Sequence, residues 1–230
     1  MFPPPALILF DIDGTLVRKA GPHHRLALEV AARQVTGLSA TTDGIPTQGM
    51  LDRDILTIML QASGASKRLI RDSMPELMRV AQNVYSRQCP ADLSKKVCPG
   101  ARMLLYKLYR KRLPTGLVTG NLSRIAWKKM ERAGLKQYLR FGAFAELADT
   151  RAGLVKIAID EARRRKWIGP QTLISLIGDH PNDILAAKAN GVRSIAVATG
   201  VVPGAELATH QPDLLIDDMR QLHPETLLKA

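Results

Sequence analysis

The chain has 230 residues and a formal net charge of +12, and 46% of its residues are hydrophobic. This is enough for one large domain or two small ones, with a core that needs no disulfide or metal to hold it together. The two cysteines, Cys89 and Cys98, lack the spacing of zinc ligands, so we expect free thiols in a reducing compartment. Basic residues fall in short groups on different predicted elements and aromatic residues make up only 4%, which argues against a nucleic-acid surface.

The beginning of the chain does not look like a targeting signal. Three prolines precede a short apolar run that ends in carboxylates (residues 3–13, PPPALILFDID). A signal peptide needs a charged start, a longer apolar run and a cleavage site with small residues. No stretch approaches the roughly 18 apolar residues of a membrane helix. We therefore expect a soluble, cytoplasmic protein that crosses no membrane.

The first predicted strand covers residues 6–10 (ALILF), and its unbroken hydrophobicity is typical of a strand buried on both faces of a parallel sheet. The segment 11–15 (DIDGT) follows it directly. Alternate residues of an extended segment point the same way, so Asp11 and Asp13 can face one site. That site would lie at the carboxyl end of the strand, where open parallel sheets bind their ligands.

The stretch from residue 17 to residue 96 shows no strand pattern. Its apolar residues and its glycine and proline breaks predict three helices instead, at about residues 22–36, 52–63 and 66–88. A helical block inserted after the first strand would lie over the edge of the sheet like a lid.

A second strand is predicted at residues 116–119 (GLVT). It ends in Thr119 and Gly120, which offer a hydroxyl group and backbone N–H groups to an anion in front of the next helix. That helix is expected to run from Ser123, as its N-cap, to about Ala133.

The remaining chain alternates between strand and helix. The alternation predicts an α/β fold with a Rossmann-like parallel sheet. The expected strands are 141–145, 173–177, 194–198 and 214–216, and the expected helices are 151–166 and 181–190.

Two more carboxylates, Asp179 and Asp183, follow the strand at residues 173–177. Several acids that converge on one sheet edge repel each other and need a cation. An oxygen-only ligand set favours a hard ion, Mg²⁺ before Ca²⁺. A calcium loop that starts at Asp11 is excluded, because its sixth and twelfth positions hold Leu16 and Pro22 instead of Gly and Glu.

The three motifs together resemble the haloacid dehalogenase (HAD) superfamily. They are the segments 11–16 (DIDGTL), 117–121 (LVTGN) and 178–183 (GDHPND), with Arg151 between the second and the third. The segment 98–105 (CPGARMLL) is similar to the lead-in of the phosphoglycolate phosphatase-like branch. The resemblance covers essentially the whole chain. It implies a HAD-fold catalytic core formed by residues 1–16 and 97–230, and a small helical cap domain formed by residues 17–96.

The resemblance also implies roles for single residues. Asp11 matches the nucleophile, Asp13 the general acid and base, and Asp179 the acidic metal ligand. A Mg²⁺ ion would be bound by Asp11, by Asp179 and by the backbone carbonyl of Asp13. The other matches are the phosphate-binding Thr119 and Gly120, and the supporting acid Asp183.

The phosphate-binding cation is less defined. Arg151 stands where most members of the family have a lysine, so Lys129 and Lys156 remain alternatives. In the cap, the loop 47–53 occupies the place where relatives contact substrate, with Asp52 and Arg53 as candidates; Asp52 could equally be an ordinary helix start.

The predicted activity is Mg²⁺-dependent hydrolysis of a small phosphorylated metabolite, such as a phosphoglycolate-like monoester, through an aspartyl-phosphate on Asp11. Asp13 would need a raised pKa to protonate the leaving group. The alternatives are a phosphomutase or phosphotransferase of the same fold, a 2-haloacid dehalogenase, and a non-enzymatic binding protein. The expected partner is a small phosphorylated substrate, and the protein is expected to be a monomer or a homodimer.

Overall fold

The computed structural model describes residues 4–18 and 20–229. In these residues six parallel strands form a sheet in the order β3-β2-β1-β4-β5-β6. The predicted α/β class with a Rossmann-like parallel sheet is therefore confirmed. The strands are β1 Ala6–Phe10, β2 Thr115–Val118, β3 Phe141–Ala143, β4 Leu173–Gly178, β5 Arg193–Val197 and β6 Leu214–Ile216.

Strand β1 lies in the middle of the sheet, and all five of its side chains are buried. It pairs with β2 on one side and with β4 on the other, with Phe10 opposite both Leu117 and Ile177. The chain continues from β1 to β2 and β3 on one side, and then returns to β4, β5 and β6 on the other. The strand order thus reverses between β1 and β4, and open α/β sheets bind ligands at such a reversal, outside the carboxyl ends of the strands.

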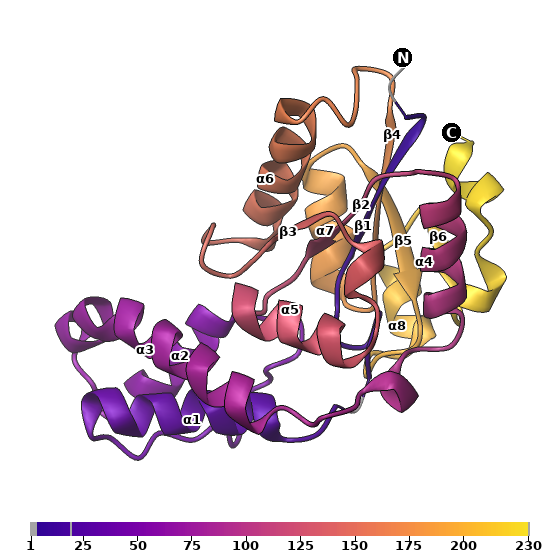
Figure 1. The fold of residues 1–230 in the computed structure, drawn as a ribbon. Helices are drawn as coiled ribbons and strands as arrows, with labels where there is room; N and C mark the ends of the chain where they lie inside the picture. The colour runs from indigo at the N-terminus through magenta and orange to yellow at the C-terminus, as the bar shows by residue number, and fades with distance from the viewer. Residues whose placement is uncertain (1–3, 19, 230) are drawn as a thin grey trace.

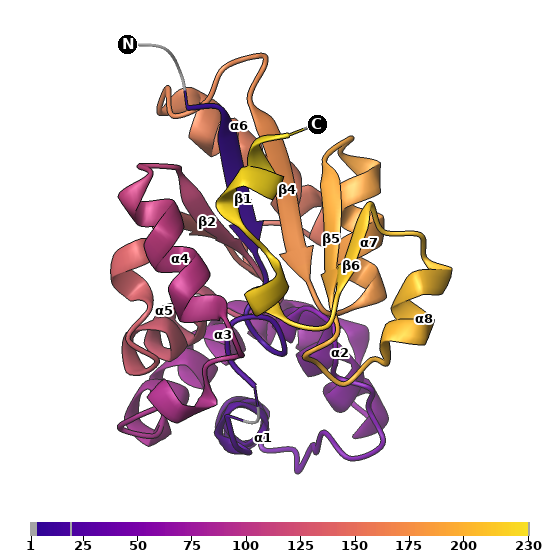
Figure 2. The same ribbon diagram turned by 90° about the vertical axis from the view of Figure 1, so that its right-hand side faces the viewer.

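Helices cover both faces of the sheet (Figure 1 and Figure 2). Helices α6 and α7 pack on one face; α4 and two short 3₁₀ helices near the C-terminus pack on the other. None of the helices in the described residues is long and apolar enough to cross a membrane. The helices that follow residue 97 include α4 Ala101–Arg110, α5 Ser123–Arg132, α6 Arg151–Arg164, α7 Pro181–Ala189, α8 Gly204–Thr209, η3 Met219–Gln221 and η4 Pro224–Leu228.

Three further helices lie below the arrowheads of the strands in Figure 2, beyond the carboxyl edge of the sheet. They are α1 His23–Thr36, α2 Asp52–Ala62 and α3 Lys67–Gln88, close to the predicted ranges. Their apolar faces meet one another, and Leu28, Leu56 and Leu77 are fully buried. We refer to residues 17–96 as the helical block.

The chain enters and leaves the helical block at one place. Val17 and Val97 form an antiparallel bridge, and the backbone N–H of Arg18 donates to the carbonyl of Lys96 at 2.9 Å. The two connections therefore run side by side, which places the whole block over the strand ends.

One predicted helix cap is wrong. Ser123 is the first residue of α5, and the N-cap position is held by Leu122 without a side-chain hydrogen bond. The backbone N–H of Ser123 instead donates to the carboxylate of Glu146, at 3.0 and 3.1 Å to its two oxygens. A carboxylate from a distant loop thus replaces the local cap, a long-range choice that propensities alone do not reveal.

Truncation of a core side chain in β1 should destabilise the protein strongly. Leu9 is fully buried in the central strand, so Leu9→Ala should lower the free energy of unfolding by about 2–5 kcal/mol. The same substitution at Leu215, which is 38% exposed on the edge strand β6, should cost less than about 1 kcal/mol. Urea unfolding measures both values. Equal losses would contradict the central position of β1.

Candidate active site

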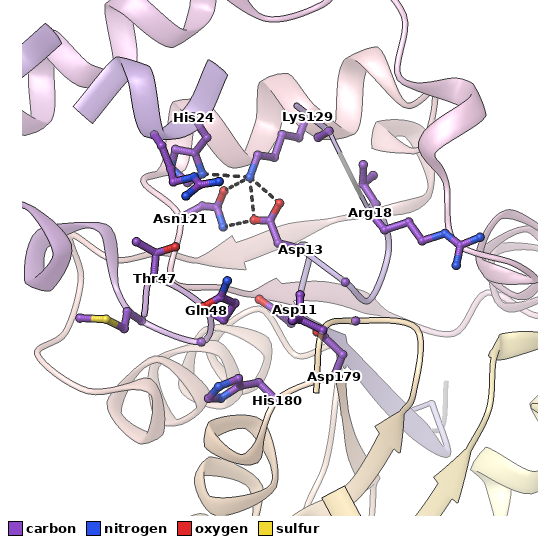
Figure 3. Close-up of a pocket in the computed structure, with 18 of the residues that line it drawn as sticks. Asp11, Asp13, Arg18, His24, Thr47, Gln48, Asn121, Lys129, Asp179 and His180 are labelled. Carbon is purple, nitrogen blue, oxygen red and sulfur yellow. Dashed lines mark hydrogen bonds and ion pairs between the residues drawn. The ribbon is translucent and has the colours of Figure 1, made fainter. Parts of the chain in front are cut away.

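A cavity of about 760 Å³ lies at the carboxyl edge of the sheet. Its walls come from both the sheet and the helical block, and many of the lining side chains are polar (Figure 3). The core contributes Asp11, Asp13 and Asp179, among others, and the helical block contributes His24, Gln48 and Asp52. Every carboxylate that the sequence placed at the ends of β1 and β4 thus lies at or beside one enclosed space.

Three carboxylates meet at this edge of the sheet, and two of them, Asp11 and Asp179, line the cavity. Asp11 follows β1, Asp179 follows β4 and Asp183 lies in the first turn of α7. All three are buried, and one carboxylate oxygen from each lies within 4.8 Å of the others. The backbone N–H of Asp11 donates to the carbonyl of Ile177 at 2.9 Å, so sheet pairing continues into the site and fixes the approach of β1 to β4.

The crowding of these acids changes their protonation. Burial, together with the charges of Asp11 and Asp183, raises the pKa of Asp179 well above its ordinary value. Burial, opposed by Arg151 and reinforced by Asp11, raises the pKa of Asp183 to about 7. Such shifts mean that the site holds more negative charge than the protein compensates, and a bound cation would relieve the repulsion.

Arg151 is the cation closest to these acids. It begins α6 and is buried, with Nη1 at 2.5 Å from Asp183 Oδ1 and 3.1 Å from Asp11 Oδ1. Burial acts to lower the pKa of Arg151, but the charges of Asp183 and Asp11 raise it above its ordinary value. The guanidinium group therefore stays charged beside the carboxylate of Asp11. The rival Lys156 is exposed to solvent and does not line the cavity.

Lys129 is also buried, but it forms its ion pair with a different carboxylate, that of Asp13. Its Nζ lies 2.7 and 2.6 Å from the two oxygens of Asp13, 2.6 Å from Asn121 Oδ1 and 3.2 Å from His24 Nδ1 (Figure 3). An ammonium group has three protons, and these four acceptor atoms are more than enough to use all of them. In this geometry Lys129 has no N–H left for a phosphate oxygen.

The expected raised pKa of Asp13 is wrong. Its side chain does not belong to the cluster of three carboxylates but pairs with Lys129 and accepts from Asn121 Nδ2 at 2.7 Å. Desolvation acts to raise the pKa of Asp13, but the charge of Lys129 and the hydrogen bonds from Lys129 and Asn121 lower it below its ordinary value. The sequence predicted acidic neighbours for Asp13, whereas in the structure its neighbours are the hydrogen-bond donors Lys129 and Asn121.

The loop after β2 is held against the helical block. Thr119 is fully buried, and its hydroxyl oxygen accepts from Asn121 Nδ2 at 2.9 Å. At Gly120 an added Cβ would come within 2.0 Å of the carbonyl oxygen of Met50, so only glycine allows this close approach. Neither of the two predicted phosphate-binding residues is among the residues that line the cavity, whereas the next residue, Asn121, is.

The two cap candidates have separate surroundings. Asp52 is buried; its Oδ2 accepts from the backbone N–H of Leu122 at 2.8 Å and lies 3.0 Å from His24 Nε2. Arg53 does not line the cavity and pairs with Asp149 at the surface. Asp52 therefore faces the cavity and the core, whereas Arg53 contacts the core at the surface, outside the cavity.

The residues present fit a hard divalent cation. Asp11 Oδ1 is buried, and among the described residues its one oppositely charged neighbour at the site is Arg151, an ion pair at 3.1 Å that does not meet hydrogen-bond geometry. An added Cβ would approach Asp179 Oδ2 to 2.1 Å at Gly14 and to 1.8 Å at Gly200, so the two glycines leave room for this carboxylate and nothing more. The cluster that they frame contains only oxygen donors, which suits Mg²⁺ better than a soft metal.

Comparisons with known proteins identify the family. The sequence profile of the haloacid dehalogenase-like hydrolases matches residues 8–197. The chain belongs to this family. The predicted family and the predicted enzyme class, a hydrolase of the phosphatase type, are therefore confirmed.

Three similar proteins illustrate the range of the family. A phosphoglycolate phosphatase of Pseudomonas fluorescens is 27% identical over 98% of this chain and 81% of its own length. The β-phosphoglucomutase of Clostridium difficile has a TM-score of 0.70 at 22% identity, over 98% of this chain and 95% of its own. CbbY of Rhodobacter sphaeroides, solved with xylulose-1,5-bisphosphate, has a TM-score of 0.72 at 18% identity, over 99% of this chain and 100% of its own. The two structures support the haloacid dehalogenase-like fold alone.

Sequence reasoning missed several residues of the cavity. His24 and Asn121 were not predicted as functional, and Lys129 was considered only as a phosphate ligand. Arg18 and Arg25 also line the cavity. The one available signal was Lys129 itself, because a lysine on the apolar face of a predicted helix needs an acidic partner.

The stability of the metal-free protein should fall as the pH rises from about 4 to about 7. With its pKa raised to about 7, Asp183 keeps a proton in the folded state that it loses in the unfolded state, so folding binds protons in this range and stability decreases with pH. In EDTA the wild type should lose at least about 1 kcal/mol more than Asp183→Asn, the equivalent of one pKa unit. Saturating Mg²⁺ should abolish the difference. Parallel pH profiles for the two proteins in EDTA would contradict the raised pKa.

Proposed function

We propose that the protein is a Mg²⁺-dependent phosphatase that hydrolyses a small phosphorylated metabolite through an aspartyl-phosphate on Asp11. The observation that carries the proposal is that three buried carboxylates and one buried arginine lie together at the carboxyl ends of β1 and β4. Membership of the haloacid dehalogenase-like hydrolases and the likeness to phosphoglycolate phosphatases support it.

Asp11 is the proposed nucleophile. Its carboxylate lines the cavity, and its Oδ1 is paired with Arg151 at 3.1 Å without accepting a hydrogen bond from the described residues. Mg²⁺ would be held by Asp11, Asp179 and the backbone carbonyl of Asp13, with Asp183 in support. When bound, it would offset the repulsion between the anionic nucleophile and the anionic phosphoryl group.

Asp13 is the proposed acid and base. Its ion pair with Lys129 favours the ionised form, which can take a proton from the water that attacks the aspartyl-phosphate. A phosphoryl dianion bound nearby adds negative charge and raises the pKa of Asp13. The protonated form can then give its proton to the leaving oxygen in the first half of the reaction. Binding of substrate, rather than the resting site, would supply the raised pKa.

The phosphoryl oxygens are expected to lie between Arg151 and the loop after β2. The hydroxyl oxygen of Thr119 accepts from Asn121, and no acceptor for its own proton is found among the described residues, so that proton is free for a phosphoryl oxygen. Arg151 has an Nε without a hydrogen-bond partner among the same residues. Gly120 completes the group as a backbone donor. Fixed donors of this kind supply much of the rate of phosphoryl transfer.

The helical block is the proposed cap, and the core is formed by residues 1–16 and 97–230. The block closes the cavity from the side opposite the sheet, and a closed site keeps water away from the reacting group. Its loop 47–50 reaches the core: Gly49 accepts from Asn182 Nδ2 at 2.8 Å, and an added Cβ at Gly49 would meet His180 at 2.2 Å. The cap would have to open for substrate entry and product release.

Substitution of the nucleophile should abolish turnover. We expect Asp11→Asn to lower Mg²⁺-dependent hydrolysis of p-nitrophenyl phosphate by about 10³-fold or more, because the covalent route is lost. Asp160→Asn, on the exposed side of α6, is the matched control and should keep wild-type activity. Turnover by Asp11→Asn at the rate of the control would remove the nucleophile from the proposal, and undiminished activity in EDTA would remove the metal.

The two buried cations should differ in phosphate binding. Arg151→Gln should weaken the binding of inorganic phosphate in the presence of Mg²⁺ by about 10- to 100-fold, the value of a charge-assisted hydrogen bond. Lys129→Met should change it by less than about 3-fold, because the partners of Lys129 already use all its protons. Isothermal titration calorimetry measures both constants. A larger loss in Lys129→Met than in Arg151→Gln would reverse the assignment.

A further inference from the structure

A continuous polar chain connects the helical block to Asp13. It runs from Asp52 at the start of α2 to His24 on α1, then to Lys129 on α5 and finally to Asp13. The three links measure 3.0 Å, 3.2 Å and 2.6 Å. Figure 3 shows the imidazole of His24 and the amide of Asn121 directed at the ammonium group of Lys129.

The proton count allows only one arrangement of this chain. Lys129 is a donor without an acceptor, so His24 Nδ1 must accept from it. The neutral imidazole then carries its proton on Nε2 and donates it to Asp52 Oδ2. A protonated His24 would point an N–H at the ammonium group and break the link. Each member therefore fixes the orientation of the next.

The chain crosses from the helical block to the core. His24 and Asp52 belong to the block, whereas Lys129 and Asp13 belong to the core. Asp52 also grips the core directly: its backbone N–H donates to the carbonyl of Gly120 at 2.8 Å, and its Oδ2 accepts from the backbone N–H of Leu122 at 2.8 Å. The position of Asp52, and through it that of His24, is thus tied to the contact between α2 and the start of α5.

We propose that His24 and Asp52 are a positioning pair that couples the docking of the helical block to the orientation of Asp13, with Lys129 as the link. The inference rests on the proposed function of Asp13 as acid and base. Neither residue of the pair is proposed to transfer a proton to substrate. When the block is docked, His24 accepts a hydrogen bond from one N–H group of Lys129, and the remaining two N–H groups are directed at Asp13 and Asn121. When the block moves away, this constraint on the ammonium group is lost.

A histidine of the helical block is the third partner of a buried core lysine. The side chain of Lys129 is 1% exposed, whereas that of Asp13 is 46% exposed to the cavity. The core alone offers three acceptors, the two oxygens of Asp13 and Asn121 Oδ1, and His24 Nδ1 is a fourth for only three N–H groups. The docked state is therefore the state in which one N–H of Lys129 is directed at the block, and Asp13 shares the other two with Asn121.

The test uses the dependence of the rate on the leaving group. Phenyl phosphate and p-nitrophenyl phosphate have similar size, but the phenoxide is the more basic leaving group and depends more on a proton from Asp13. We expect His24→Phe to lower kcat/KM for phenyl phosphate by about 10- to 100-fold and for p-nitrophenyl phosphate by much less. This substitution keeps the edge-on aromatic contact with Tyr85, at 5.8 Å between ring centroids, so folding should be preserved.

Conservative variants separate positioning from packing. His24→Gln and Asp52→Asn can keep the hydrogen bonds and should restore the wild-type ratio of the two kcat/KM values, whereas Asp52→Ala should behave like His24→Phe. The matched control is His23→Phe, because the Nδ1 of this neighbouring histidine has no hydrogen-bond partner among the described residues. The control should leave the ratio unchanged.

The possible outcomes are distinct. If His24→Phe lowers kcat/KM for both substrates equally, its role is structural and the positioning pair is overturned. An unchanged ratio and unchanged rates overturn it as well, while turnover that still depends on Asp11 leaves the proposed phosphatase intact. If Asp11→Asn hydrolyses both substrates like the wild type, the proposed function itself fails. A folding defect in Asp52→Ala leaves the decision to His24→Phe.

Discussion

Several carboxylates lie close together at one buried edge of the sheet, and their mutual repulsion is the constraint on which the rest of the site depends. Asp11, Asp179 and Asp183 have oxygens within 4.8 Å of one another, in a place with little solvent to screen them. Arg151 offsets part of this charge, and the pKa values of Asp179 and Asp183 still rise. Groups with pKa values perturbed in this way concentrate at functional sites, and the arrangement supports the proposed binding of a cation and an anion together.

The two buried cations divide the site into two electrostatic regions. Arg151 serves the acids that are proposed to bind the metal and accept the phosphoryl group, and Lys129 serves the acid that is proposed to move protons. This separation lets two carboxylates only two residues apart, Asp11 and Asp13, act differently.

The sequence predicted the fold well because its strongest signals are local. The unbroken apolar run of β1 and the acids directly after it are enough to place Asp11 at a sheet edge, and the same holds for Asp179 after β4. Asp13 and His24 show the limit. The partners of Asp13 come from α5 and from the loop after β2, and His24 meets Lys129 across 105 positions of sequence. The contacts of Asp13 follow from packing within the core and that of His24 from the packing of the helical block on the core, and no local pattern encodes either.

The side-by-side connections at Val17 and Val97 have a consequence for the segment between them. Because the inserted segment leaves the sheet and rejoins it at a single bridge, its two ends are already neighbours. A segment with adjoining ends can be exchanged for another of different length without disturbing a single strand of the sheet. The length of the inserted segment is thereby independent of the geometry of the sheet, whereas the contact of His24 with Lys129 still ties its sequence to the site.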